Sequence, residues 1–115
     1  MHNFKDLRVW QKSIDLAIDF YQAISFFPDT EKFGLISQMK RAAVSIPSNI
    51  AEGAGRNSNK EFKYFLSISL GSAFEIETQL IIANRLELIN NIITNELNDK
   101  ISDIQRMIFS LEKTL

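Results

Sequence analysis

The stretch KDLRVWQKSIDLAIDFYQAISF, residues 5–26, decides the fold class because its apolar residues recur at the spacing of a helix. Alternating steps of three and four residues separate the members of one stripe, Leu7, Trp10, Ile14, Ala17, Tyr21 and Ile24. This is the heptad spacing of a helix that packs against other helices. We therefore predict a helix over residues 5–26, and we expect this stripe to face the core.

The second expected helix covers residues 31–54, where apolar residues repeat at the same spacing. Asp29 or Thr30 can cap its start, because their side-chain oxygens accept hydrogen bonds from free backbone N–H groups. Gly53 and Gly55 are expected to end it, since glycine favours the C-terminal end of a helix.

Two more helices follow. Ser58 and Glu61 form a capping box that opens a helix running to about Leu86. The last expected helix covers residues 95–113, with Thr94 as its N-cap and an unbroken heptad stripe.

Four amphipathic helices with short connections close most simply as an antiparallel up-down four-helix bundle. We therefore predict an all-α fold in which residues 1–115 form a single domain. Pro47 interrupts the second helix but leaves the apolar repeat in phase, so we expect a kink there rather than a helix end.

The composition excludes several kinds of protein. The 115 residues contain no Cys and a single His, His2, which excludes disulfides, thiolate metal sites and catalysis by an interior imidazole. Charged residues near the N-terminus disfavour a signal peptide, and the longest uncharged run, residues 64–74, is short for a membrane span. We expect a soluble cytoplasmic protein that binds no membrane.

Residues 5–26 carry a second apolar stripe on the far side of the helix. It consists of Val9, Leu16 and Phe20 and continues to Phe27. A bundle helix needs an apolar arc of little more than about 100°, and this helix has about twice that. One interpretation is a wide core stripe with a few exposed apolar residues. The other, which we favour, is a second packing surface and hence self-assembly.

The second helix carries a polar stripe at helical spacing, made of Gln38, Arg41, Ser45, Asn49, Glu52 and Arg56. It is either a solvated face or a surface for close contact between chains, because short Ser and Asn side chains allow helices to approach. Glu52 can pair with Arg56 one turn on or with Arg41 of a neighbouring copy, and Glu77 needs a partner, for which an Arg is the obvious candidate. The predicted oligomer interface comprises Val9, Leu16, Phe20, Phe27, Arg41, Ser45, Asn49 and Glu52.

Residues 31–35 (EKFGL), 41–53 (RAAVSIPSNIAEG) with Arg56, 71–80 (GSAFEIETQL) and 4–10 (FKDLRVW) resemble the four-helix-bundle family of the 23S rRNA intervening-sequence protein. The match covers essentially the whole chain. The resemblance implies a small bundle that assembles as a ring-like homopentamer without known catalytic activity. A relative, the accessory protein of diversity-generating retroelements, is associated with nucleic acid and reverse transcriptase through a positive surface.

Two features depart from that family. Its third connection usually has a Leu-Gly-aromatic turn, whereas Leu86 is followed here by Glu87 and Leu88, which leaves the form of this loop open. The formal net charge of −1 is also lower than in relatives that bind nucleic acid.

No constellation for catalysis stands out. The sequence lacks a Glu-x-x-His pair for a di-metal site, a nucleophile–base arrangement and a phosphate-binding glycine motif. We therefore expect no enzyme activity, no cofactor, no metal and no small-molecule substrate.

Nucleic-acid binding is the alternative function. Basic residues favour the first half of the chain, where Lys5, Arg8, Lys12, Arg56, Lys60 and Lys63 are the candidate contacts. A ring of identical chains would repeat these patches around its axis. Against this, the net charge is negative, and solvated Lys and Arg side chains explain the residues equally well.

Overall fold

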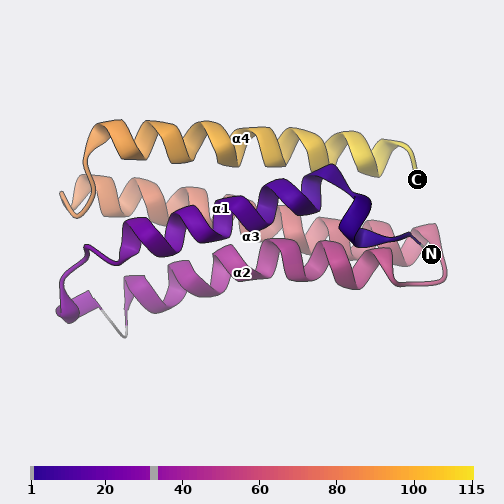
Figure 1. Cartoon of the computed structure of the whole chain (residues 1–115), viewed down its shortest axis with the longest axis horizontal. Helices are drawn as coiled ribbons and strands as arrows, with labels where there is room; N and C mark the ends of the chain where they lie inside the picture. Colours follow the sequence, from indigo (N-terminus) through magenta and orange to yellow (C-terminus); the bar gives the residue numbers. More distant parts are fainter. Residues whose placement is uncertain (1, 32–33) are drawn as a thin grey trace.

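Four long helices run alternately up and down in the computed structural model, which describes residues 2–31 and 34–115 (Figure 1). The helices are α1 (Arg8–Ile24), α2 (Leu35–Ala54), α3 (Asn59–Arg85) and α4 (Asn91–Lys113), with short 3₁₀ turns at Phe4–Asp6 (η1) and Asp29–Glu31 (η2). The prediction of an all-α, antiparallel four-helix bundle is confirmed. The described chain passes through Pro47 inside α2 without a helix end.

The helices form a square in cross-section. The α1 helix packs against α2 and α4, and α3 packs against the same two helices, with the most extensive contact between α2 and α3. The α1 and α3 helices therefore lie on a diagonal (Figure 1). The long axis of the bundle is 43 Å, close to the roughly 40 Å expected of a 27-residue helix such as α3.

The predicted stripes of the last three helices supply most of the core. Their buried members are Met39, Ala43, Ile46, Ile50, Phe62, Leu66, Ala73, Ile76, Leu80, Ala83, Leu97, Ile101, Ile104 and Ile108. The buried Ser69 hydroxyl donates a 2.9 Å hydrogen bond to the Ile46 carbonyl oxygen, so this polar group inside the α2–α3 contact is satisfied.

The prediction of which side of α1 faces the core is wrong for most of the helix, although Ile24 of the predicted stripe is buried. The stripe expected to stay uncovered lies inside the single chain: Val9 is 4%, Leu16 1%, Phe20 0% and Phe27 6% exposed. Ser13 lies among them and donates to the Trp10 carbonyl oxygen at 2.8 Å, so its hydroxyl can be buried without losing a hydrogen bond.

The helix ends agree with the sequence in part. The Ser58 hydroxyl accepts a 3.2 Å hydrogen bond from the Glu61 N–H, as the capping box predicts. The predicted N-caps of α2 and α4 are wrong. The α2 helix begins at Leu35 after Gly34, while Asp29 and Thr30 belong to the separate η2 turn. Glu31, where the helix was expected to start, also belongs to η2, and residues 32–33 lie outside the described residues.

The α4 helix begins one turn earlier than predicted. Asn90 is its N-cap and accepts a 2.8 Å hydrogen bond from the Ile93 N–H. Thr94, the predicted cap, lies in the first turn and donates to the Asn90 carbonyl oxygen. Both residues are good caps, so local sequence alone did not separate them. Burial of Ile89 at the end of the bundle favours the earlier start.

The α3 helix is the one described helix long and apolar enough to cross a membrane by length and composition. The uncharged-run criterion missed this window because Glu75 and Glu77 interrupt it. Phe62, Leu66 and Ile76 on one side of α3 are fully covered by the bundle, which is the behaviour of a core helix.

The connection after α3 uses a left-handed residue. Glu87 has φ 62°, and the Leu88 N–H donates to the Ala83 carbonyl oxygen at 3.0 Å while the Glu87 N–H donates to Asn84 at 2.9 Å. These two hydrogen bonds define a Schellman motif with Glu87 at the position that usually holds glycine. The non-glycine turn therefore keeps the helix end that a glycine would give.

Glu87→Gly should raise the free energy of unfolding by about 1 kcal/mol, because a side chain in the left-handed region costs about that much. Urea unfolding followed by circular dichroism measures it. Leu86→Gly is the matched control, since Leu86 has φ −82° and gains nothing from glycine. Equal effects of the two substitutions would show that the left-handed conformation costs nothing.

Candidate assembly interface

An apolar groove runs along the surface between α1 and α2. It has a volume of about 350 Å³, and its lining is Phe4, Trp10, Ile14, Ala17, Ile18, Val44, Pro47, Ser48 and Ala51. All but one of these residues are apolar. The side of α1 that was assigned to the core thus forms one wall of a solvent-facing groove.

The groove keeps large apolar side chains in water. Ile18 is 51%, Val44 43% and Tyr21 42% exposed. The Lys40 ammonium lies 5.0 Å from the centre of the Tyr21 ring, which sets a cation beside the apolar surface. The four residues from which self-assembly was predicted are thus covered within one chain, as in the first interpretation from the sequence, and the apolar side chains that α1 leaves exposed lie on the other side of the helix.

Aromatic packing between Phe4 and Trp10 closes one end of the groove. The Phe4 ring in η1 meets the Trp10 ring edge-on, with 5.1 Å between ring centres. This contact orders the start of the described chain against α1. The groove is therefore a preformed feature of the bundle.

A second apolar surface lies on α3, which we call the α3 face. It consists of the exposed residues Tyr64, Phe74, Ile81 and Ile82, of which Tyr64 is 63% exposed. Since α1 and α3 lie on a diagonal of the bundle, the α3 face and the α1–α2 groove are separate surfaces.

The polar stripe of α2 is engaged within its own chain. The Ser45 and Ser72 hydroxyl oxygens are 2.8 Å apart across the α2–α3 contact, and the Asn49 amide donates to the Ser45 carbonyl and hydroxyl oxygens at 2.8 and 2.9 Å. Glu52 forms an ion pair of 2.6 Å with Arg56, one of the two pairings that the sequence allowed. Short polar side chains here allow α2 and α3 to approach, and Arg41 stays exposed.

The expected Arg partner of Glu77 is wrong. The Gln105 amide donates to the Glu77 carboxylate at 3.0 Å. A neutral donor suffices because Glu77 is only partly buried and keeps access to water.

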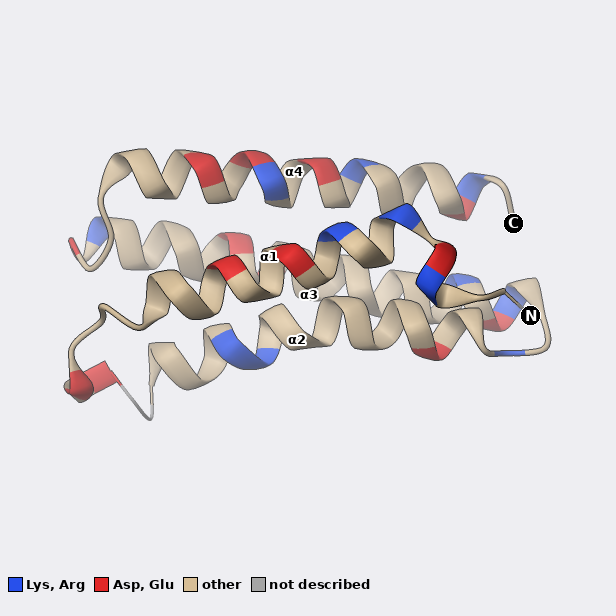
Figure 2. Cartoon of the chain, viewed as in Figure 1, with Lys and Arg blue, Asp and Glu red and all other residues tan. Residues whose placement is uncertain are grey.

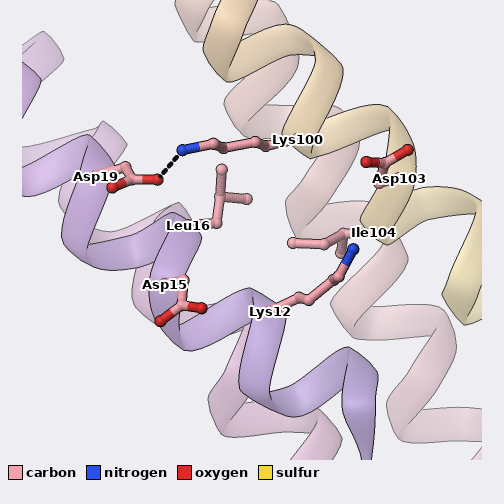
Figure 3. Close-up of a pocket in the computed structure, with 7 residues that line it drawn as sticks. All are labelled: Lys12, Asp15, Leu16, Asp19, Lys100, Asp103 and Ile104. Carbon is pink, nitrogen blue, oxygen red and sulfur yellow. Dashed lines mark hydrogen bonds and ion pairs between the residues drawn. The ribbon is translucent and has the colours of Figure 1, made fainter.

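A charged cleft separates α1 from α4 (Figure 3). Cations and carboxylates alternate along it: Lys12, Asp15, Asp19, Lys100 and Asp103 surround Leu16 and Ile104 in a cavity of about 200 Å³. Two lysines therefore face three aspartates, which leaves the cleft slightly negative and without a strong field of one sign. Among the described residues no three His, Asp or Glu side chains group where they could hold a metal ion.

Lys100 and Asp19 bridge this cleft with a 2.5 Å ion pair (Figure 3). The hydrogen bond that the Lys100 ammonium donates to the Asp19 carboxylate raises the pKa of Lys100 above its ordinary value of 10.5. A raised lysine pKa stabilises the fold at neutral pH, and that contribution is lost only as the pH rises through the folded-state value. Both side chains are substantially exposed, so the pair contributes at most about 1 kcal/mol.

Comparison with known proteins identifies the family to which this four-helix bundle belongs. The family model of the 23S rRNA-intervening sequence protein matches residues 5–110. The chain belongs to this family. Among solved structures, a protein of unknown function from the S23 ribosomal protein family of Bacteroides thetaiotaomicron VPI-5482 is similar. It has 28% identity and a TM-score of 0.85, over 91% of this chain and 98% of that chain. No curated protein sequence matches closely enough to count as a relative.

The basic residues of the chain gather toward one end of the bundle (Figure 2). The antiparallel helices bring residues 2–15, 45–71 and 103–115 to the end where both termini lie. These segments contain eight Lys and Arg against six Asp and Glu, while residues 16–31, 34–44 and 72–102 contain four against eight. The candidate contacts Lys5, Arg8, Lys12, Arg56, Lys60 and Lys63 all lie in the basic half. The bundle is thus polarised along its long axis.

Sequence reasoning missed the residues that form the groove. Trp10, Ile14 and Ala17 were assigned to the core, and Val44 was assigned to no surface. The position of Phe27 is a sequence signal for the correct side, because it continues the stripe of Val9, Leu16 and Phe20 past the end of the helix, and the structure buries it.

Proposed function

We propose that this protein is a non-enzymatic structural or interaction module whose working state is a homo-oligomer. The α1–α2 groove carries the proposal, because exposed Ile18 and Val44 line it together as an apolar surface that a second protein surface would cover. The resemblance stated above sets the proposed ring size at five.

Ile18→Glu should turn the assembly into folded single chains, because it places a charge in the groove while leaving the core untouched. Light scattering coupled to size-exclusion chromatography at micromolar concentration gives the mass. Wild-type protein should have several times the chain mass of 13.2 kDa, and the variant should have one chain mass. Gln22→Glu adds the same charge on an exposed part of α1 outside the groove and should leave the mass unchanged. A wild-type mass of one chain would refute self-assembly.

A second candidate function, favoured by the axial polarisation of charge, is RNA or DNA binding through the basic end. Phosphate contacts dominate nucleic-acid affinity, and a ring whose copies point the same way would gather several basic ends on one side. The exposed Lys60 and Lys63 in the first turns of α3 are suited to such contacts.

Affinity for a structured RNA, followed by fluorescence anisotropy, should fall about tenfold or more between 50 and 200 mM salt if three phosphates are contacted per site. The double substitution Lys60→Glu with Lys63→Glu should weaken binding further. Arg85→Glu at the acidic end is the control and should have little effect. Binding that ignores salt, or equal losses from both variants, would count against this function.

A further inference from the structure

We infer that the occupant of the α1–α2 groove is the α3 face of a second copy of this chain, standing beside the first and pointing the same way. The inference rests on the self-assembly proposed above and specifies how the copies meet. It makes the contact heterologous: each copy offers its groove to one neighbour and its α3 face to another.

The separation of the two surfaces favours a heterologous contact. A two-fold contact between grooves would leave Tyr64 and Phe74 of each copy in water, and a two-fold contact between α3 faces would leave Ile18 and Val44 in water. One heterologous contact, repeated around a closed ring, covers both surfaces on every copy.

The heights of the apolar residues along the bundle agree with this pairing. The contact between Ser45 and Ser72 sets the register of α2 against α3. Because the two helices are antiparallel, a residue after Ser72 on α3 is level with a residue the same number of positions before Ser45 on α2. By this count Phe74 lies at nearly the same height as Val44, which lines the groove with Ile18. Copies that point the same way around a ring axis along the bundles would therefore bring Phe74 against these two residues.

The remaining α3 face residues have partners at their own heights. By the same count, Tyr64 lies close to the level of Ala51, at the end of the groove that Phe4 closes. Ile81 lies beyond the level of Lys40 and Tyr21, toward the exposed end of α1. Apolar surface thus meets apolar surface over the part of the contact between Tyr64 and Phe74.

Charge adds a second match. Arg41 lies one turn before Ser45, and Glu75 lies about one turn after Ser72, so the two stand at the same height. Both are exposed, and neither takes part in an ion pair formed between described residues. Lys40 beside Tyr21 adds a second cation to the groove side. The groove is therefore flanked by positive charge where the facing α3 surface carries negative charge.

Mixing two blocked variants tests the pairing. Ile18→Glu removes the groove, and Phe74→Glu removes the α3 face, so each variant alone should be a single chain. Mixed at equal concentration they should form a 1:1 dimer, because one intact groove and one intact α3 face remain. Light scattering and native mass spectrometry measure the product. The control is Asn95→Glu, which is used in place of Phe74→Glu. Asn95 is an exposed position on α4, so the Asn95→Glu variant should assemble fully by itself.

The possible results separate this inference from the proposed function. If the wild-type protein is itself a single chain, both the proposed self-assembly and the heterologous pairing are refuted. Wild-type assembly with a mixture that stays monomeric, or with a Phe74→Glu variant that still assembles, overturns the heterologous pairing and leaves self-assembly intact. Circular dichroism checks that each variant is folded, and Val44→Glu and Ile82→Glu replace any variant that is not.

The charge match is tested between chains. In the 1:1 dimer, the Phe74→Glu chain supplies the groove, so Arg41→Glu belongs on that chain and should weaken the dimer about threefold to fivefold. Glu75→Arg on the Ile18→Glu chain should restore the affinity. Failure of this second substitution to restore it would contradict the contact between Arg41 and Glu75.

Discussion

Phe20→Glu should unfold the chain, not release folded single chains from an assembly. The Phe20 side chain is fully buried in the core. Removing a buried phenylalanine side chain costs about 3–5 kcal/mol, and a carboxylate left in its place is desolvated without a partner. Together these effects approach or exceed the total stability of a small domain, which is about 5–15 kcal/mol.

Thermal and urea unfolding followed by circular dichroism measure this effect, and near-ultraviolet spectra report the loss of aromatic packing. Ile18→Glu is the matched control, since it makes the same charge change two residues away on the groove side. That variant should still be folded and melt cooperatively, at a temperature below the assembled wild type only by the contribution of assembly. A Phe20→Glu protein that also melts cooperatively near the wild-type temperature would place Phe20 on the surface and contradict the fold.

The contrast between Phe20 and Ile18 explains what could be predicted for α1. The period of 3.6 residues identifies a helix and its apolar stripes, but it does not say which stripe faces inward when two satisfy it. The continuous stripe through Trp10 and Tyr21 looked like the better seam. Tertiary packing selected the other, in which the Ser13 hydroxyl is satisfied by its own helix.

The remaining helices have a single candidate stripe, and there the sequence predicted the core well. Leu97, Ile101, Ile104 and Ile108 are all buried as expected. The connections were harder, because several Asn, Asp and Thr residues offer equivalent caps within one turn of each other. Asn90 and Thr94 are the clearest case, since the choice depends on how Ile89 packs over the bundle end.

The sequence predicted exposed apolar surface on α1 but not the residues that form it. Composition and amphipathicity predict that α1 has more apolar surface than one bundle uses. The residues that remain outside depend on the choice of core stripe, and half of the predicted interface, Val9, Leu16, Phe20 and Phe27, moved into the core with that choice. Groove residues from α2 such as Val44 depend on how two helices cross, which no single-helix pattern contains.

The α2–α3 contact depends on Gly53, and Gly53→Ala should lower the free energy of unfolding by about 2 kcal/mol. A Cβ at this position would lie 2.7 Å from the Phe65 Cβ, 3.0 Å from the Phe62 ring and 3.2 Å from the Phe62 carbonyl oxygen. Two of these three atoms belong to the backbone or lie next to it, so rotating a side chain does not relieve the clash. The helices must move apart, and this outweighs the gain of up to about 1 kcal/mol that alanine brings inside a helix.

Gly53 therefore allows α2 and α3 to pack closely, whereas the sequence analysis expected it to end the helix. The structure has Gly55 as the C-cap of α2, in an ordinary right-handed conformation. Gly71→Ala is the control, because a Cβ there meets nothing within 4 Å, and it should stabilise the chain by about 0.5–1 kcal/mol. Both substitutions are best measured by urea unfolding in the Ile18→Glu background, so that loss of assembly does not contribute to the apparent stability. Opposite signs are expected at the two glycines, and a stabilised Gly53→Ala protein would show that α2 and α3 approach less closely than the structure has them.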